Sequence, residues 1–314
     1  MIMIDFEKLF TEASSTGIGS QKLLDINTIL KIYYGISNDG CYRLAFCSTI
    51  TPPKIESTKQ ILVTQGPEAP GVCWTCFDLL KQDASAAFFA FCLNLVEAVI
   101  NAEDETTALN KLKKRYICWK TMFKNEPKGT LSKETIQGLF GELYYLETHM
   151  VNTYGYKSAI EGWGGPDATS KDFVVNNDWY EIKTIGVSSP VVKISSLTQL
   201  SSSNPGHLVI IRVEQMPAGF SNGKSSVLEL VSLLLSNIND EGLENLFLSK
   251  VSSYGLTLDS KEIEMRFDVK SKDKYIVTDG FPRITLENNN YPEIANATYE
   301  ISVAGIHRFL EDEK

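Results

Sequence analysis

The stretch KDFVVNNDWYEIKTI, residues 171–185, puts charged side chains inside what reads as a pair of buried strands. Two apolar runs flank an Asn-Asn pair at 176–177, and asparagine tolerates the positive φ angles of a tight hairpin turn. Asp172, Glu181 and Lys183 lie within these runs. Because a charge in a core strand is costly unless it is paired or binds a metal ion, the stretch predicts an ion-paired hairpin or a metal site.

A two-residue turn at this place fixes which residues face one another. Val175 then pairs with Asp178, and Asp172 lies opposite Glu181, where the Cβ atoms of opposed residues are about 4.5–5.5 Å apart. Lys183 shares this face because side chains two apart in a strand point the same way. Two close carboxylates repel unless a positive charge lies between them. Spacing alone leaves two interpretations open: Lys183 neutralises both acids, or a cation such as Mg²⁺ does.

Hydrophobic periodicity and turn signals predict the elements around the hairpin. A helix at 132–150 starts at Ser132, a good N-cap, and carries Glu142 and Glu147. Strands are expected at 172–175, 179–185, 190–195 and 207–216, with a short helix at 196–202. The order α-β-β-β-α-β predicts the fold class α/β (α+β) with a mixed central sheet.

Breaks in these patterns suggest three regions. Residues 1–125 are β-rich and then helical, with helices near 86–102 and 105–123. Residues 126–216 form the predicted core. Residues 217–314 contain helices near 227–236 and 241–253 and strands near 262–270, 274–286 and 297–303, for which packing against the core is one arrangement.

Composition indicates a globular protein. The 314 residues are 43% hydrophobic and 22% charged. No apolar run reaches the roughly 18 residues of a membrane span. The start, MIMIDFEKLF, lacks the features of a secretory signal, so we expect a cytoplasmic protein with six reduced cysteines. CWTC at 73–76 supplies only two of the four ligands of a structural zinc site, and small core cysteines are the favoured interpretation.

The net charge of −9 is unevenly distributed. Residues 111–133 hold eight basic residues against one acid, Glu126. This segment predicts a local surface that binds a polyanion, with Lys113, Lys120 and Lys124 as candidate DNA contacts. A solvated helix face is the alternative.

A set of ordered motifs carries a family resemblance. These are GELYYLE (141–147), WGGP (163–166), KDF (171–173), EIKT (181–184), KISSLTQL (193–200) and GFPRI (280–284). Together with Asp172, Glu181 and Lys183 they resemble the PD-(D/E)XK nuclease superfamily. The closer resemblance is to an uncharacterised bacterial family with this motif, which is often associated with restriction and phage-defence gene sets.

The resemblance implies roles for these residues. Asp172 and Glu181 would bind Mg²⁺, for which Mn²⁺ could substitute, and Lys183 would aid hydrolysis. An acid on the preceding helix is often a further ligand, which implies Glu142 as a catalytic and metal-binding residue. The glycines beside Glu142 and its position on the flank of the apolar face favour it over Glu147.

Two further positions need a choice. The literal Pro-Asp pair ends at Asp167, upstream of the predicted strand pairing, so the hairpin geometry favours Asp172. Gln199 lies after the third predicted strand, where related nucleases place a polar residue at the active-site edge or the DNA backbone. An ordinary surface position is the alternative for Gln199.

These observations predict a metal-dependent DNA endonuclease of a restriction-modification or phage-defence system. Its expected partners are DNA, a methyltransferase or other defence proteins, and a second copy of itself, with no membrane. The alternative is a catalytically silent DNA-binding or scaffolding subunit that retains the nuclease fold.

Overall fold

The structure, a computed structural model, describes residues 4–81, 84–122, 132–166, 171–217, 220, 222–256, 261–288, 291 and 293–311. The chain divides into two compact units. The first contains Met1–Lys128, Leu235–Asn237 and Gly255–Glu264, and the second contains Gly129–Leu234, Ile238–Tyr254 and Met265–Lys314. The division into three regions at 125/126 and 216/217 stays a prediction.

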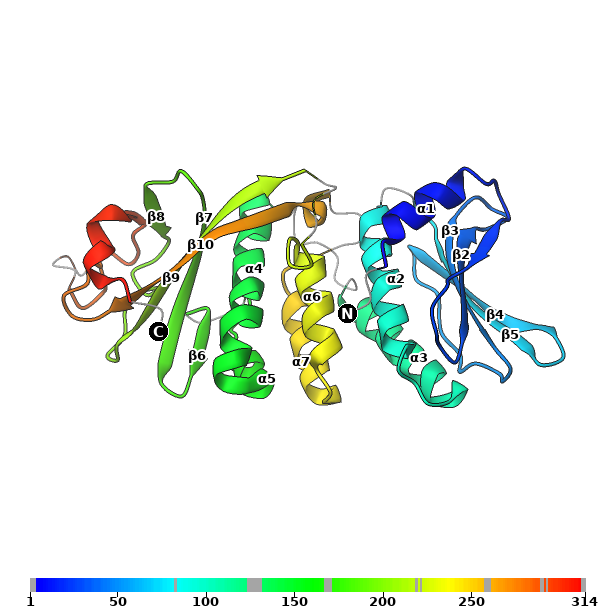
Figure 1. The fold of residues 1–314 in the computed structure, drawn as a ribbon. Helices are drawn as coiled ribbons and strands as arrows, with labels where there is room; N and C mark the ends of the chain where they lie inside the picture. Colours follow the sequence, from blue (N-terminus) through cyan, green and yellow to red (C-terminus); the bar gives the residue numbers. More distant parts are fainter. Residues whose placement is uncertain are drawn as a thin grey trace. The chain divides into compact units, whose positions relative to one another are not determined.

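The first unit is built on an antiparallel sheet (Figure 1). Its strand order is β1-β2-β3-β5-β4, with β1 at Gln21–Leu23, β2 at Lys31–Ile36, β3 at Tyr42–Ser48, β4 at Ile61–Ala69 and β5 at Val72–Leu79. Its helices are α1 (Phe6–Ser14), α2 (Ser85–Val99) and α3 (Glu105–Met122). The hairpins and the two longer helices follow the sequence pattern, whereas α1 and β1 were not predicted.

Aromatic side chains join the helices of the first unit to one face of its sheet. The ring of Phe10 in α1 lies 6.1 Å from Tyr34 and 5.9 Å from Phe88, centroid to centroid. The ring of Phe77 in β5 lies 5.7 Å from Phe91 in α2. Such pairs add about 0.5–1.5 kcal/mol beyond the burial of their area, so this cluster is a main source of stability.

The second unit contains a mixed sheet of order β10-β9-β7-β6. Its strands are β6 (Phe173–Val175), β7 (Asp178–Gly186), β9 (Gly206–Met216) and β10 (Arg266–Val277). β7 runs parallel to β9, and the other neighbours are antiparallel. A parallel pair needs a long crossover, and here the crossover contains β8 (Val191–Ile194). The expected α+β class with a mixed sheet is confirmed.

Strands from the end of the chain complete this unit. β10 pairs with β9 along the whole of both strands, with a bulge between Val269 and Ser271. β11 (Tyr299–Ser302) pairs with β8. The separate strands predicted at 262–270 and 274–286 are wrong, because β10 is one strand over Arg266–Val277 that the bulge accommodates without a break.

A long helical segment precedes the hairpin. α4 (Lys133–Tyr145), a π-helical turn η2 (Leu146–Met150) and α5 (Val151–Gly162) follow one another directly. The hydroxyl of Ser132 accepts a hydrogen bond from the Thr135 amide at 3.1 Å, as expected for the N-cap. The predicted end at 150 is wrong. Gly155, with φ of 76° and ψ of 160°, has a non-helical backbone that kinks α5, and so the sequence shows no single helical period there.

The remaining helical elements are α6 (Val227–Asn237), α7 (Glu241–Ser252), η3 (Lys261–Glu264) and η4 (Ala304–Phe309). Within the second unit, Lys250 of α7 anchors this helix to the end of α5. Its ammonium donates to the carbonyls of Ile160 at 2.8 Å, Glu161 at 3.1 Å and Trp163. A cation at a helix C-terminus satisfies carbonyls that have no helical partner. No helix among the described ranges is long and apolar enough to cross a membrane.

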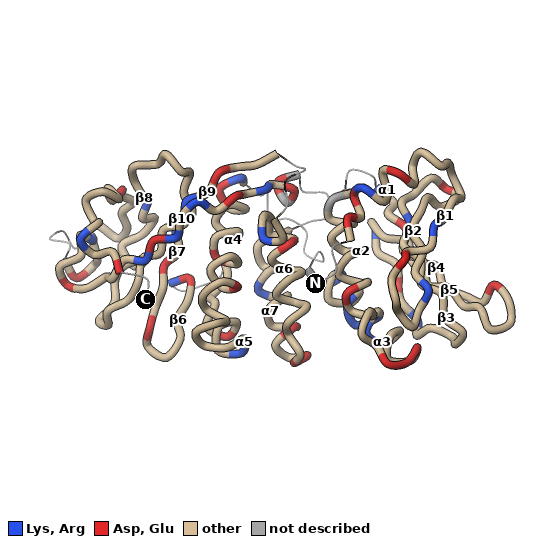
Figure 2. Tube along the Cα trace, in the orientation of Figure 1, with Lys and Arg blue, Asp and Glu red and all other residues tan. Residues whose placement is uncertain are grey.

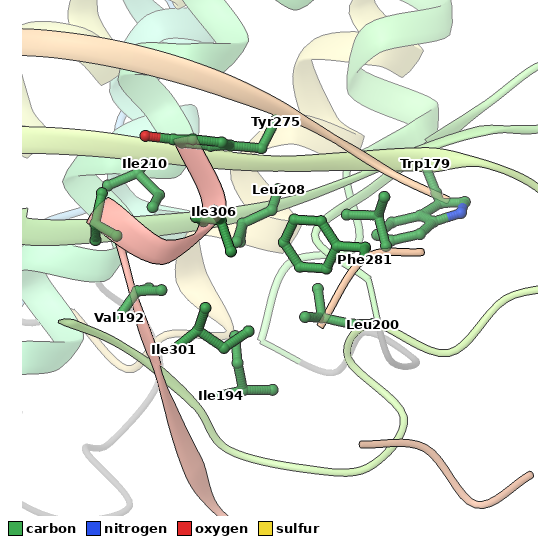
Figure 3. Packing of buried hydrophobic residues seen from close by; sticks show 12 residues of the cluster. Trp179, Val192, Ile194, Leu200, Leu208, Ile210, Tyr275, Phe281, Ile301 and Ile306 are labelled. Carbon is green, nitrogen blue, oxygen red and sulfur yellow. The ribbon is translucent and has the colours of Figure 1, made fainter. Parts of the chain in front are cut away.

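The sheet face away from α4 and α5 carries a hydrophobic core, shown in Figure 3. It joins side chains of the sheet to the β8–β11 pair and η4. Its members are Trp179, Val192, Ile194, Leu200, Leu208, Ile210, Tyr275, Val277, Phe281, Ile301, Val303 and Ile306. Because Trp179 belongs to this face, Glu181 and Lys183 point to it as well.

The short helix predicted at 196–202 is wrong, since residue 196 is a bend, residues 197–200 form hydrogen-bonded turns and residues 201–202 have no regular structure. The reason lies in side-chain hydrogen bonds that replace a helical ladder. The carbonyls of Thr198 and Gln199 accept from the Lys171 ammonium at 2.7 and 2.6 Å. The Gln199 side chain accepts from the Ser195 amide at 2.7 Å. Backbone groups bonded in this way no longer need a helix.

Gly141 lets α4 approach β7 closely. A Cβ atom added at Gly141 would lie 1.7 Å from Thr184 Oγ1, and the Gln137 amide donates to the Thr184 carbonyl at 2.8 Å. A Cβ atom at Gly138 would meet nothing within 4 Å. Packing therefore requires a glycine at position 141 and not at position 138. The close approach at Gly141 also fixes the distance of the next residue, Glu142, from the sheet.

We expect Gly141→Ala to lower the free energy of unfolding by about 1–3 kcal/mol, because the added methyl overpacks the contact with Thr184. Gly138→Ala is the matched control and should stabilise the protein by about 0.5–1 kcal/mol, the gain of replacing glycine in a helix. Urea unfolding of both variants measures this difference. Equal stabilisation by both substitutions would contradict the close approach, and Thr184→Ala added to Gly141→Ala should recover part of the loss.

Candidate active site

The hairpin has the register that the sequence predicts. Val175 pairs with Asp178, and Phe173 pairs with Tyr180. The turn residues Asn176 and Asn177 have φ angles of 52° and 75°, which a two-residue hairpin turn of this hand requires. Continuing the register by one pair places Asp172 opposite Glu181.

The carboxylate of Asp172 is tied to the neighbouring strand. Asp172 Oδ2 accepts a hydrogen bond of 2.6 Å from the Ile182 amide. The Asp172 carbonyl accepts from the Gly164 amide at 2.8 Å. These two bonds hold the residue between β7 and the segment that follows α5, so its second carboxylate oxygen is oriented by the backbone.

Glu181 and Lys183 form an ion pair inside the unit. Glu181 is only 1% exposed, and its Oε1 lies 2.8 Å from Lys183 Nζ. The same ammonium donates to Gln199 Oε1 at 3.2 Å. Sequence analysis considered Gln199 as a DNA contact or a surface residue, and the structure places its side chain against Lys183. A DNA contact by Gln199 stays a prediction.

Lys171 is a second buried cation that sequence analysis did not assign to the site. Its ammonium donates to the carbonyls of the 196–200 turn, as described above, and lies 4.4 Å from the Trp179 ring centroid. Burial lowers the pKa of Lys171 to about 8, although Glu181 and Asp172 oppose this. The available signal was its place directly before Asp172, at the start of an apolar run where an exposed lysine is not expected.

Glu142 reaches the carboxylates from α4. Its Oε2 accepts hydrogen bonds of 2.8 Å from Trp163 Nε1 and 2.8 Å from the Tyr254 hydroxyl. The competing residue, Glu147, forms an ion pair of 2.7 Å with Lys224 instead. The structure therefore places Glu142 within electrostatic range of Asp172, whereas Glu147 is paired with Lys224. Sequence reasoning missed Tyr254, which lies 112 residues further along the chain.

The three carboxylates act on one another electrostatically. Burial, followed by the charge of Asp172, raises the pKa of Glu142 to about 8. Burial and then Asp172 also raise the pKa of Glu181 to about 8, against the lowering effect of Lys183. Burial likewise raises the pKa of Asp172, against the Ile182 amide and the two lysines. The site therefore has less positive charge than its carboxylates require.

The donor set suits a hard divalent cation. The protein uses Asp172 Oδ2, Glu181 Oε1 and Glu142 Oε2 in hydrogen bonds or ion pairs, which leaves one oxygen of each carboxylate. Mg²⁺ typically takes one or two carboxylates and several waters. Within the described ranges, no group of three or more His, Cys, Asp or Glu side chains is arranged to hold a metal ion. The residues thus fit a cation held mainly by water and one or two carboxylates, and their roles as ligands stay a prediction.

The candidate DNA contacts lie apart from this constellation in the chain. Lys113 and Lys120 belong to α3 in the first unit, whereas the carboxylates belong to the second. Figure 2 shows Lys and Arg positions along α3. Lys120 Nζ lies 3.2 Å from Glu56 Oε2, so part of its charge is neutralised. Lys124 and the alternative Asp167 lie outside the described residues.

Comparison with known proteins gives one match. The sequence model of a family described as "Putative PD-(D/E)XK family member (DUF4420)" matches residues 5–304. The match includes the first unit, although the motifs that carry the family resemblance all lie in the second. No curated protein and no solved structure matches the chain.

The raised carboxyl pKa values predict that stability falls as pH rises. The folded protein keeps a proton on Glu142, which has no cationic partner among the described residues, up to about pH 8, whereas an unfolded chain releases it near pH 4.3. The folded state binds more protons between these values, so its stability decreases across the interval. We expect Tm, measured in EDTA, to fall from pH 5 to pH 8.

Glu142→Gln should make this fall smaller, because it removes the carboxyl group that the folded state holds protonated. Glu147→Gln is the matched control on the same helical segment and should keep the slope of the wild type. An identical slope in Glu142→Gln and the wild type would show that Glu142 is ionised in the folded protein.

Proposed function

Because the chain belongs to the DUF4420 family of PD-(D/E)XK type, we propose that it is a divalent-cation-dependent endonuclease that hydrolyses phosphodiester bonds in DNA. The family supports a nuclease-like fold. The observation that carries the proposal is that buried Glu181, paired with Lys183, lies opposite Asp172 on the hairpin, and that both carboxylates act electrostatically on Glu142 of α4.

Asp172 and Glu181 would hold Mg²⁺, or Mn²⁺ in its place, and Glu142 would hold it directly or through water. When bound, such a cation polarises a phosphodiester and lowers the pKa of water. The protein itself would hold the carboxylate oxygens in fixed positions. The Ile182 amide fixes Asp172, and Trp163 and Tyr254 fix Glu142.

Lys183 is the residue that would stabilise negative charge developing on the phosphoryl oxygens. A preorganised cation in a buried site acts more strongly than one in water. Lys183 has two partners, Glu181 and Gln199. If Glu181 turns an oxygen toward a cation, Gln199 still holds the ammonium, so Lys183 stays in place.

DNA as substrate and a role in restriction or phage defence belong to the proposal. They are supported by the family resemblance and by the basic residues of α3. A methyltransferase, other defence proteins or a second copy of the chain are proposed partners on the same basis, and an intracellular bacterial setting goes with them.

A second candidate function is that of a catalytically silent DNA-binding or scaffolding subunit. The Glu181–Lys183 ion pair favours it, because this pair neutralises the glutamate without a metal. The net charge of −9 also favours a protein that depends on a partner for DNA binding. The two functions differ in whether Lys183 and Asp172 are needed for cleavage.

We expect the purified full chain to cut plasmid or single-stranded DNA with Mg²⁺ or Mn²⁺ and not with EDTA. Lys183→Ala and Asp172→Ala should each lower the cleavage rate by about 10²-fold or more, the effect of removing one preorganised charge-stabilising group. Agarose gels of nicked and linear plasmid over time measure the rates.

Lys193→Ala is the matched control, because Lys193 is an exposed lysine of β8 in the same unit. It should cleave like the wild type. Cleavage that survives in Lys183→Ala and Asp172→Ala would overturn the assignment of the site. Cation-independent DNA binding without cleavage, equal in the wild type and both variants, would favour the scaffolding function.

A further inference from the structure

We propose that Tyr254 and Trp163 are positioning residues that set the affinity of the candidate site for a divalent cation by holding the carboxylate of Glu142. This inference rests on the proposed function, because it concerns the same site. It adds a role for the turn that follows α7, which lies outside the predicted core at 126–216.

Two hydrogen-bond donors converge on a single oxygen of Glu142. Trp163 Nε1 and the Tyr254 hydroxyl both lie 2.8 Å from Oε2. The terminal torsion of a glutamate has a broad energy minimum, so a free carboxylate rotates readily. Two donors on Oε2 fix that rotation and leave Oε1 without a hydrogen bond among the described residues. Glu142 therefore offers one defined oxygen instead of two exchanging ones.

The two donors are themselves held rigidly. Trp163 is fully buried, and its ring stacks on Tyr254 with centroids 6.2 Å apart and an interplanar angle of 16°. Phe247 of α7 packs 5.9 Å from the same indole. Stacking fixes the planes of both rings. The Trp163 N–H and the Tyr254 O–H are therefore already oriented toward Glu142 Oε2, and little side-chain entropy of these two residues is lost when a cation binds.

Backbone contacts join the segment of Trp163 to the start of the hairpin and to α7. Trp163 forms an isolated β-bridge with Phe173, and the Gly164 amide donates to the Asp172 carbonyl. The three carbonyl contacts of Lys250 join α7 to the end of α5. The indole that orients Glu142 is thus part of the segment that lies beside Asp172, so the two carboxylates are held by one connected framework.

Tyr254→Phe tests the role because it removes only the hydroxyl and keeps the ring that stacks on Trp163. Outer-shell partners of ligands typically change metal affinity by about 10–100-fold, and we expect Tyr254→Phe to weaken Mn²⁺ binding by about 10-fold. The measurement is calorimetric titration of the full chain with Mn²⁺ without DNA, at a temperature well below the Tm of each variant.

Tyr154→Phe is the matched control. Its hydroxyl donates to a carboxylate, Asp178 Oδ2, at 2.9 Å and contacts Tyr180 at 2.8 Å, but it does not touch Glu142. This variant should bind Mn²⁺ like the wild type. Glu142→Ala should weaken binding, and Tyr254→Phe added to Glu142→Ala should cause no further loss, because Tyr254 acts through Glu142.

The outcomes separate this inference from the proposed function. Wild-type affinity in Tyr254→Phe, together with weaker binding in Glu142→Ala, overturns the positioning role and leaves the site intact. An equal loss in Tyr254→Phe with and without Glu142 also overturns it, since the hydroxyl would then act elsewhere. Absence of Mn²⁺ binding by the wild type, or binding unchanged by Asp172→Asn, overturns both.

Discussion

Burying the carboxylate of Glu181 next to that of Asp172 is the constraint on which the rest of the second unit depends. Both groups lie on one hairpin whose register is fixed by its turn, so the chain cannot separate them. Each neighbouring feature supplies a donor or a positive charge to this place. Lys183 pairs with Glu181, the Ile182 amide holds Asp172, and Lys171 lies beside both. These groups supply less positive charge than the carboxylates require, and a bound cation would supply the rest.

The two lysines reach this place through different parts of the fold. Lys183 lies on β7, and Lys171 lies just before β6, yet both are bound to Gln199. Gln199 uses its side-chain oxygen for one lysine and its main-chain carbonyl for the other. A single residue of the crossover between β7 and β9 therefore couples the two sides of the hairpin. The parallel pairing of β7 with β9 makes this possible, because it requires a crossover that passes the hairpin face.

Local rules account for the parts of the site that sequence analysis could predict. The turn at Asn176-Asn177 sets the register, and the register sets Asp172 against Glu181 with Lys183 on the same face. The N-cap at Ser132 and the strands β7, β8 and β9 are likewise local. The contributions that were missed are long-range or contrary to local pattern. Tyr254 is an ordinary aromatic at the end of an ordinary helix. The 196–200 turn reads as a helix because nothing local shows that Lys171 takes its carbonyls.

The contacts of this turn with Lys171 couple it to the start of β6. A helix carries its own hydrogen bonds, but the 196–200 turn has two of its carbonyls bonded to a side chain from a distant segment. Detachment of the start of β6 would remove the Lys171 ammonium from the Thr198 and Gln199 carbonyls and so weaken the turn. Gln199, Lys183 and Asp172 thus belong to one cooperative unit that opens and closes together. The contacts of Lys171 with the turn and of Asp172 with the Ile182 amide are therefore coupled to the pairing of β6, an edge strand of three residues.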